Sequence, residues 1–387
     1  MRRVLHVMGS LERSGMEAML LSSYDEWLRL GYECDLVATA PTVGPLAPQL
    51  RERGYGVFHT PFRSRWRLLP RLGFILDFYR LCRSGYDVVH VHVEAGRPFF
   101  ALLAKLAGVR QIAATPHNTF RFESSLRIRK FCERHLIQLL GGRFGMISDG
   151  VQTCEWDQYR IRGPRIWNWF DTSHFRPPSR EERADARRSL EIKEDDFVLV
   201  SVGNCNSAKN HGALLRAIAL LPAEVCPLYL HIGREEQDFP ERRLASDLKI
   251  ENHVRFLDSQ QDPRPFLWAA DLFAMPSRSE GLSIAALEAI AACAPALFSN
   301  VVGLADIAAV TRWTVLTTTA PESIAEGIVR IASMDLAERN ERALVDSELV
   351  RDRFSPRNGV RSIAESLYAP RMIASQMPAR VSGQSSQ

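Results

Sequence analysis

The sequence lacks paired cysteines, long apolar runs and the glycine pattern of dinucleotide-binding loops. Its seven cysteines are dispersed and none forms a Cys-x-x-Cys pair, which offers no zinc or redox motif and is typical of free thiols in a reducing compartment. The longest nearly apolar stretch, residues 281–298, contains a glutamate and a proline, and the apolar run 4–8 is too short for a signal peptide. No nucleic-acid-binding motif is present. We therefore expect a soluble, cytoplasmic protein that binds no nucleic acid.

Short apolar runs alternate with amphipathic segments along the 387-residue chain, of which 46% is hydrophobic and 24% charged. These proportions are those of globular proteins, and the length is sufficient for two domains. We expect helices in the amphipathic segments, such as 16–30, 68–83 and 99–107. The expected strands are 4–8, 34–38, 57–60, 88–92, 111–115, 144–148, 165–167, 197–202, 228–232, 253–257, 272–275 and 296–299. This alternation predicts an α/β fold with parallel sheets covered on both faces.

A proline-rich stretch without periodicity, residues 175–180, interrupts the alternation and indicates a linker. Two α/β domains joined there would enclose a cleft, with the carboxyl ends of both sets of strands facing it. The predicted organisation is an N-terminal domain (1–175), a C-terminal domain (176–357), a closing helix (358–369) and a polar, disordered tail (370–387).

The segment Pro276 to Glu288 carries the strongest functional signal. An apolar strand stops at Pro276, a small polar loop follows, and an apolar helical pattern then begins. Amides at the start of a helix favour an anion, typically a phosphate. Glu280 and Glu288 bracket this start, and eight helical steps would separate them by roughly 12 Å. That is the scale of an extended sugar nucleotide.

Loops at the ends of four other predicted strands carry further candidate residues. The first contains Ser14 and Gly15, and a glycine there lets the backbone approach a ligand closely. In the second domain, Gly203 and Asn204 lead to Lys209 at the start of a helix, where a cation opposes the helix dipole and is more readily explained by an anionic ligand. His92 and His117 stand at the ends of two further strands, where they can hydrogen-bond a sugar or serve a structural role.

Together these features resemble the retaining glycosyltransferases of family 4 (group 1), which have the GT-B fold: two Rossmann-like parallel-sheet domains facing a central cleft. The resemblance covers about residues 4–369. The matching elements are the E-x7-E pair Glu280 and Glu288, the V-G…K-N-H loop ending near Lys209, Gly15, the T-x-H loop at His117, and the boundary sequence Asn168-Trp169-Phe170-Asp171 with Phe175. The members closest in character assemble capsule, exopolysaccharide or lipopolysaccharide.

The resemblance assigns roles to individual residues. It implies that Glu280 faces the donor sugar, that Glu288 binds the ribose hydroxyls and that Lys209 holds the diphosphate. The remaining donor-binding residues implied are Gly203, Asn204, Gly281, Leu282 and Ser283. The residues implied at the cleft and on the acceptor side are Ser14, Gly15, His92 and Asn118, while His117 would contact the donor sugar and take part in catalysis.

The implied reaction moves a sugar from a UDP- or GDP-sugar to a glycan or lipid-linked glycan in cell-surface polysaccharide synthesis. The resemblance implies no metal, in keeping with the absence of an Asp-x-Asp sequence, and no other cofactor. Asn204 stands where the family usually has Arg, and Arg234 or Arg278 is our candidate replacement. Two alternatives stay open: a non-catalytic GT-B scaffold that partners an active transferase, and a sugar-nucleotide epimerase on the same fold.

Charge is concentrated in one region although the chain carries only +4 overall. Residues 61–140 hold 14 Lys or Arg against 5 Asp or Glu. Within them, segments 62–69 and 127–131 interleave basic with aromatic and aliphatic residues, which is typical of a face that touches anionic lipid. Solvated helix faces with long arginines give the same pattern. An anionic membrane surface is therefore a predicted partner.

Overall fold

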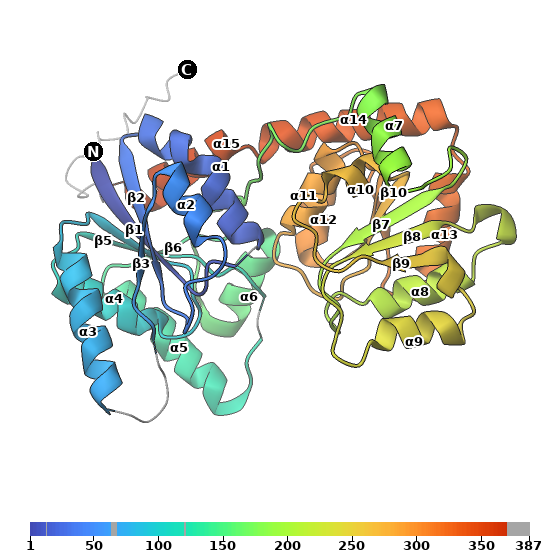
Figure 1. The fold of residues 1–387 in the computed structure, drawn as a ribbon. Coiled ribbons are helices and arrows are strands. Elements are labelled where there is room, and N and C mark those ends of the chain that lie inside the picture. Colours follow the sequence, from blue (N-terminus) through green and yellow to red (C-terminus); the bar gives the residue numbers. More distant parts are fainter. Residues whose placement is uncertain (13, 63–67, 120, 370–387) are drawn as a thin grey trace, which may run out of the picture.

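The computed structural model describes residues 1–12, 14–62, 68–119 and 121–369, and shows two α/β domains side by side (Figure 1). Each domain contains a six-stranded sheet in which every recorded pairing is parallel, with helices on both faces. The predicted GT-B architecture is confirmed. The expected disorder of 370–387 and the basic residues at 63–67 lie outside the described residues.

The first sheet has the strand order β3-β2-β1-β4-β5-β6. Its strands are β1 (Arg2–Met8), β2 (Tyr32–Ala38), β3 (Gly56–His59), β4 (Val88–Val91), β5 (Gln111–Ala114) and β6 (Arg143–Phe144). Its helices are α1 (Gly15–Arg29), α2 (Ala47–Arg53), α3 (Leu68–Arg83), α4 (Arg97–Leu106), α5 (Ser124–Leu139) and α6 (Asp149–Tyr159). The central strands are buried on both faces, which explains their nearly continuous apolar sequences.

The second sheet has the order β12-β11-β10-β7-β8-β9. Its strands are β7 (Val198–Val202), β8 (Leu228–Ile232), β9 (Val254–Phe256), β10 (Leu272–Met275), β11 (Ala296–Ser299) and β12 (Val315–Thr317). Its helices are α7 (Arg180–Ser189), α8 (His211–Ala219), α9 (Pro240–Asp247), α10 (Arg264–Ala269), α11 (Ile284–Ala291), α12 (Val302–Ala308), α13 (Pro321–Ala332) and α14 (Leu336–Arg353), with 3₁₀ turns at Ala223–Val225 and Glu251–His253.

The chain returns to the first domain after α14. Helix α15 (Pro356–Ile363) packs on α1 and continues into a π-helical turn, Ala364–Tyr368. The buried Tyr368 hydroxyl lies 2.6 Å from Nδ1 of His90 on β4. The last segment of the described chain is therefore part of the first domain's core rather than an appendage.

Two predicted strands are only partly correct. The expected strand 144–148 is short because Ser148 is the N-cap of α6, where its Oγ accepts the N–H of Val151 at 3.1 Å. Residues 165–167 form a single isolated bridge, between Met146 and Arg165, where the chain leaves the first sheet. Strand β12 was not predicted, since it is a three-residue edge strand that presents little periodicity.

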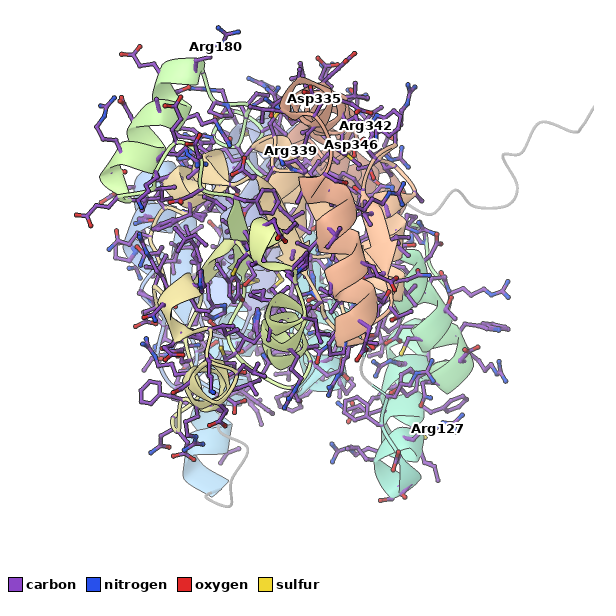
Figure 2. The ribbon with its side chains drawn as sticks, turned by 90° about the vertical axis from the view of Figure 1, so that its right-hand side faces the viewer. Arg127, Arg180, Asp335, Arg339, Arg342 and Asp346 are labelled. Carbon is purple, nitrogen blue, oxygen red and sulfur yellow. The ribbon has the colours of Figure 1, made fainter. Side chains whose placement is uncertain are left out.

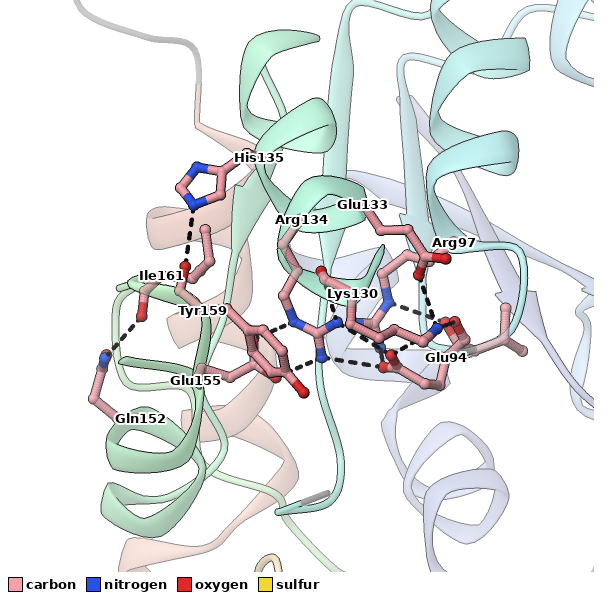
Figure 3. A network of polar contacts seen from close by, with 11 residues as sticks. Glu94, Arg97, Lys130, Glu133, Arg134, His135, Gln152, Glu155, Tyr159 and Ile161 are labelled. Carbon is pink, nitrogen blue, oxygen red and sulfur yellow. Dashed lines mark hydrogen bonds and ion pairs between the residues drawn. The ribbon is translucent and has the colours of Figure 1, made fainter. Parts of the chain in front are cut away.

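Helix α5 is held to its neighbours by a network of partly buried charges (Figure 3). Arg134 pairs with Glu155 of α6 at 2.6 Å and with Glu94 at 3.2 Å, and Arg97 of α4 reaches Glu94 at 3.0 Å. Lys130 also points inward to Glu94, at 3.2 Å. Removing one partner of a buried pair is costly, so these residues serve the fold. Lys130 is therefore not part of the exposed basic face predicted for 127–131.

Candidate functional site

The E-x7-E segment spans a loop and the first turns of α11. The helix begins at Ile284, and its N-cap Ser283 accepts the N–H of Ala286 through Oγ. Glu280 therefore lies in the loop, and the spacing estimated from eight helical steps is wrong. Glu288 lies on the helix itself. The loop still joins the carboxyl end of β10 to the start of α11, which is where a phosphate site is expected.

Lys209 and Glu280 lie in the loops that follow the adjacent strands β7 and β10, and their side chains meet. Lys209 Nζ donates a 2.6 Å hydrogen bond to Glu280 Oε1, and the buried Ser277 donates another at 2.8 Å. Lys209 lies just before α8, whose N-cap is Asn210, so it precedes the helix rather than starting it. Its aliphatic stem passes Gly203, where an added Cβ would lie 3.2 Å from Lys209 Cε.

Glu288 is half-buried and has no recorded side-chain hydrogen bond within the described ranges. Burial, and after it the negative charge of Asp171, raise the pKa of Glu288 to about 8. A carboxyl group whose pKa is raised close to neutral pH is typical of functional sites. It is also able to form hydrogen bonds as either donor or acceptor.

Asn204 stands at the position where the family resemblance led us to expect a phosphate-binding arginine. Its side-chain oxygen accepts the backbone N–H of Arg234 at 3.0 Å, so Asn204 fixes the start of the loop after β8. Arg278 donates its backbone N–H to Ala208, next to Lys209, at 2.7 Å. Both arginine side chains are exposed, and neither forms an ion pair with another described residue. Two exposed cations thus border the loop that carries Lys209.

The two domains touch where Gly281 meets the loop after β5. A Cβ at Gly281 would lie 2.3 Å from the carbonyl oxygen of His117, so only glycine permits this approach. Gly15 lies against Ile284 in the same way, with a Cβ-to-Cδ1 distance of 2.8 Å. We call this contact region the junction. It brings His117 and Gly15 of the first domain beside the segment that holds Glu280.

Other predicted residues take more local roles. Leu282 is buried, and its carbonyl accepts a hydrogen bond from Asn168 at 3.3 Å, which anchors the segment. Ser14 stands at the N-cap position of α1, where its hydroxyl donates to the Glu17 carboxylate and makes no capping hydrogen bond to the backbone. Asn118 is exposed beside His117. The contacts of Leu282, Ser14 and Asn118 within the described residues do not assign them to a ligand, so their predicted roles stay predictions.

Histidines cluster in the first domain. His92 Nδ1 lies 3.0 Å from His117 Nε2, and His92 Nε2 lies 2.9 Å from His6 Nδ1. One ligand atom each from His6, His90 and His92 falls within 4.8 Å of the others, which is the spacing of a possible metal group. Both nitrogens of His90 and of His92 already have protein partners, so a metal would have to displace hydrogen bonds.

Two pockets differ in their relation to the junction. One is lined by His92, His117 and Asn168 together with apolar side chains of the first domain. The other lies among α11, α13 and α14, beside Arg342 and Asp346 (Figure 2). There the guanidinium of Arg342 sits 4.1 Å from the ring centre of Trp313, and Asp346 accepts backbone N–H groups. These polar groups have partners, so we assign them to the fold.

Three contributors to the site were not predicted from sequence. Ser277 bonds Glu280, Thr119 Oγ1 lies 3.0 Å from Ser279 Oγ across the junction, and His6 extends the histidine row. The signal for His6 was available: a histidine in an otherwise apolar strand, in register with His90 of the neighbouring strand. The contacts of Ser277 and Thr119 depend on loop geometry and have no such signal.

Comparison with known proteins identifies the family. A model described as "Glycosyl transferase 4-like domain" matches residues 14–203, and one described as "Glycosyl transferases group 1" matches residues 182–343. The chain belongs to the group 1 glycosyltransferases. Lys209, Glu280 and Glu288 of this glycosyltransferase all lie within residues 182–343, which the group 1 model matches.

Relatives of this glycosyltransferase include proteins of surface-polysaccharide type. The putative glycosyltransferase EpsF of Bacillus subtilis is 25% identical over 87% of this chain and 90% of its own length. An Escherichia coli enzyme named UDP-Gal:alpha-D-GlcNAc-diphosphoundecaprenol alpha-1,3-galactosyltransferase is 23% identical over 78% of this chain and 80% of its own. The structure of Anabaena HepE in complex with UDP and glucose superposes with a TM-score of 0.79 at 18% identity, covering 94% of this chain and 99% of that one.

Proposed function

We propose that this glycosyltransferase retains anomeric configuration and moves a sugar from a UDP- or GDP-sugar to a hydroxyl of a glycan or lipid-linked glycan. The observation that carries the proposal is the 2.6 Å contact between Lys209 and Glu280 at the amino end of α11. A phosphate-binding cation and a carboxylate suited to sugar hydroxyls are thereby adjacent. The first domain then binds the acceptor and the second the donor.

In this proposal the donor's diphosphate lies against Lys209 and the amides of 281–283. Departure of the nucleotide leaves negative charge on the diphosphate, and fixed positive groups there lower the barrier. Arg234, after β8, and Arg278, after β10, are exposed and are our candidates for the missing arginine at Asn204. Side chains and helix amides supply the positive charge, so we propose turnover without a metal ion.

Glu288 binds the ribose hydroxyls in this arrangement. It is the fifth residue of α11, a little over one helical turn from the start of the helix, and it is half-buried. The raised pKa of Glu288 reflects a desolvated place for a carboxyl, and ribose hydroxyls would supply the hydrogen bonds that the described protein does not. The same desolvation strengthens those bonds.

The proposed step is a substitution on one face of the sugar. The bond between the anomeric carbon and the leaving phosphate oxygen breaks as the acceptor oxygen bonds to that carbon from the same side. The acceptor's hydroxyl proton passes to the departing phosphate. Glu280 and His117 position the sugar, and Lys209 stabilises the diphosphate.

Support for the donor and acceptor classes comes from the relatives. HepE binds UDP, and the Escherichia coli relative is named for UDP-galactose and a diphosphoundecaprenol-linked sugar. We propose the same chemical classes here, a uridine or guanosine diphosphate sugar and a glycan that can be lipid-linked. Cell-surface polysaccharide synthesis is the setting in which such acceptors are elongated.

A lipid-linked acceptor fits an amphipathic surface on α5. Exposed apolar and basic residues alternate along it: Leu126, Arg127, Ile128, Arg129, Phe131, Leu136 and Leu139. Ile128 is 67% and Leu139 84% exposed, which is unusual for apolar side chains on a helix that is otherwise fastened by ion pairs. We propose that this face rests on anionic lipid. Among the described residues, no helix is long and apolar enough to cross a membrane.

Calorimetric titration with UDP-, GDP- and ADP-sugars in the presence of EDTA tests the donor site. We expect one nucleotide class to bind wild type and to bind the Glu288→Ala variant about tenfold more weakly, since the carboxyl would lose hydrogen bonds to two ribose hydroxyls at about 0.5–1.5 kcal/mol each. Lack of any donor binding to well-folded protein would contradict the proposal. Binding without transfer to any acceptor would favour the scaffold alternative, and an epimerised donor would reveal the epimerase.

A further inference from the structure

A row of three histidines crosses the first domain from its core to the junction. His6 lies on β1, His92 follows β4 and His117 follows β5. The row is continuous, because His6 Nδ1 is 2.9 Å from His92 Nε2 and His92 Nδ1 is 3.0 Å from His117 Nε2. The rings of His6 and His92 are also stacked, with centroids 5.2 Å apart.

The row is uncharged, which forces its hydrogen bonds to run in one direction. Burial lowers the pKa of His6 and of His117 to about 3, and burial together with the neighbouring histidines lowers the pKa of His92 well below its ordinary value. A neutral imidazole carries one N–H and one lone pair. Each ring that donates to the next one must therefore accept from the previous one.

The inner end of the row indicates which direction costs less. His6 Nε2 is buried without a partner in the described chain, and so is Trp27 Nε1, on a ring whose centroid is 5.8 Å from that of His6. An indole nitrogen can only donate. If the row ran inward, His6 Nε2–H and Trp27 Nε1–H would be two buried, unpaired donors on neighbouring rings. If it runs outward, His6 offers a lone pair beside the indole donor.

We propose that His6 and His92 are positioning residues that hold His117 in the tautomer protonated on Nδ1, so that His117 donates this N–H to an oxygen of the substrate. Nδ1 of His117 has no recorded partner among the described residues, and His117 lines the pocket that His92 and Asn168 also line. The backbone of His117 is fixed at the same time by its approach to Gly281.

The consequence is a selective site at His117. A fixed N–H rejects a ligand group that can only donate and favours an oxygen lone pair, from either a sugar hydroxyl or a phosphate. The identity of that oxygen rests on the proposed function, whereas the tautomer does not. His117 in this state is a hydrogen-bond donor without being a cation, so it can donate to a neutral hydroxyl as well as to a phosphate oxygen.

His90 provides a matched control within the same strand. It is fully buried and two residues from His92, but its nitrogens are occupied by Thr115 Oγ1 at 2.7 Å and the Tyr368 hydroxyl at 2.6 Å. His90 is therefore outside the row. Its replacement also disturbs the core, and leaves the row's hydrogen bonds in place.

Long-range proton–nitrogen NMR of the full chain labelled with ¹⁵N-histidine tests the proposal directly. Without ligand, we expect His6, His92 and His117 each to carry hydrogen on Nδ1 and none on Nε2. Observation of an Nε2–H on His117 would overturn the proposal, and this result needs no variant. Zn²⁺ tests the metal alternative: one equivalent should leave the three signals unchanged, and binding at these nitrogens would equally overturn the proposal.

Variants and ligands complete the experiment. His6→Phe should release His117 into a mixture of tautomers and lower kcat about three- to tenfold, as expected for one hydrogen bond, while His90→Phe should change neither. Identical tautomers and rates in His6→Phe would contradict the positioning role. Adding UDP and then the UDP-sugar separates the sources of the oxygen, because a phosphate shifts Nδ1–H with UDP alone and a sugar hydroxyl only with the full donor. No shift of the His117 Nδ1–H with either UDP or the UDP-sugar would overturn donation from His117 to the substrate, even with the tautomer intact.

Discussion

Lys209 donates a 2.6 Å hydrogen bond to Glu280, so the cation proposed for the diphosphate is paired with the proposed sugar-binding carboxylate before any donor arrives. The pair is partly buried, with side-chain exposures of 24% and 11%. Its charges neutralise each other while the site is empty. In the proposed function, a donor that brings its own negative diphosphate would replace Glu280 as the partner of Lys209 and leave Glu280 to accept from sugar hydroxyls.

Lys209→Met should weaken UDP binding by about tenfold or more, because a charge-assisted bond to phosphate is lost. Lys209→Arg keeps the charge and serves as the control, with a smaller loss. Isothermal titration calorimetry at low ionic strength measures both affinities. Equal binding of UDP by wild type and Lys209→Met would show that Lys209 does not touch the diphosphate.

Glu280→Gln should have the opposite effect on nucleotide binding. The substitution removes the competing carboxylate, so Lys209 is free for phosphate and UDP affinity should rise or stay level. Turnover of the UDP-sugar should nevertheless fall by about 100-fold, because the carboxylate is needed in the transition state. Steady-state kinetics alongside calorimetry separates these effects. A parallel loss of UDP affinity and turnover would instead mark Glu280 as part of the phosphate site.

The fold was predictable because parallel strands buried on both faces leave an unambiguous apolar signal, as in β1 and β10. The strand-to-helix loops that carry Lys209 and Glu280 were predictable for the same reason. The contact between these two residues was not, since it depends on how two loops 71 positions apart are placed. The missed strand β12 lies at a sheet edge, where burial and periodicity are weak.

Glu288→Gln should stabilise the protein most at high pH. Burial and Asp171 raise the pKa of Glu288 from 4.5 to about 8, so between these values the folded chain holds a proton that the unfolded chain releases. The free energy of unfolding therefore falls as pH rises through that window. Glutamine removes this penalty, and the difference in Tm from wild type should grow between about pH 5 and 8.

Differential scanning calorimetry across that range measures the effect. The exposed Glu326 on α13 provides the control, because Glu326→Gln changes one charge at a solvated surface. A Glu288→Gln curve parallel to wild type at every pH would contradict the burial of this carboxyl. The variant should also bind the donor more weakly. Weaker donor binding would show that the stability lost by burying Glu288 serves function, whereas unchanged binding would assign Glu288 a purely structural role.

Gly281→Ala should disrupt the junction. The new Cβ would lie 2.3 Å from the His117 carbonyl oxygen, and two backbones cannot separate without moving the domains. We expect a loss of about 1–3 kcal/mol, seen as a lower Tm, together with reduced turnover. Gly15→Ala is the comparison, because its nearest atom is the end of the flexible Ile284 side chain. Equal, small effects of both variants would mean that the domains do not meet this closely in solution.

Membrane contact through α5 should appear as co-sedimentation with anionic vesicles that weakens as salt is raised. The double variant Arg127→Glu and Arg129→Glu should lose this binding, since each basic residue near the surface contributes about 1 kcal/mol. Arg180→Glu on α7 is a matched control: Arg180 is equally exposed but lies far from Arg127, in the other domain (Figure 2). Both variants should keep their turnover of soluble acceptors, while only the α5 variant should slow on a lipid-linked acceptor in vesicles. Absence of vesicle binding by wild type at low salt would rule out this surface as a lipid contact.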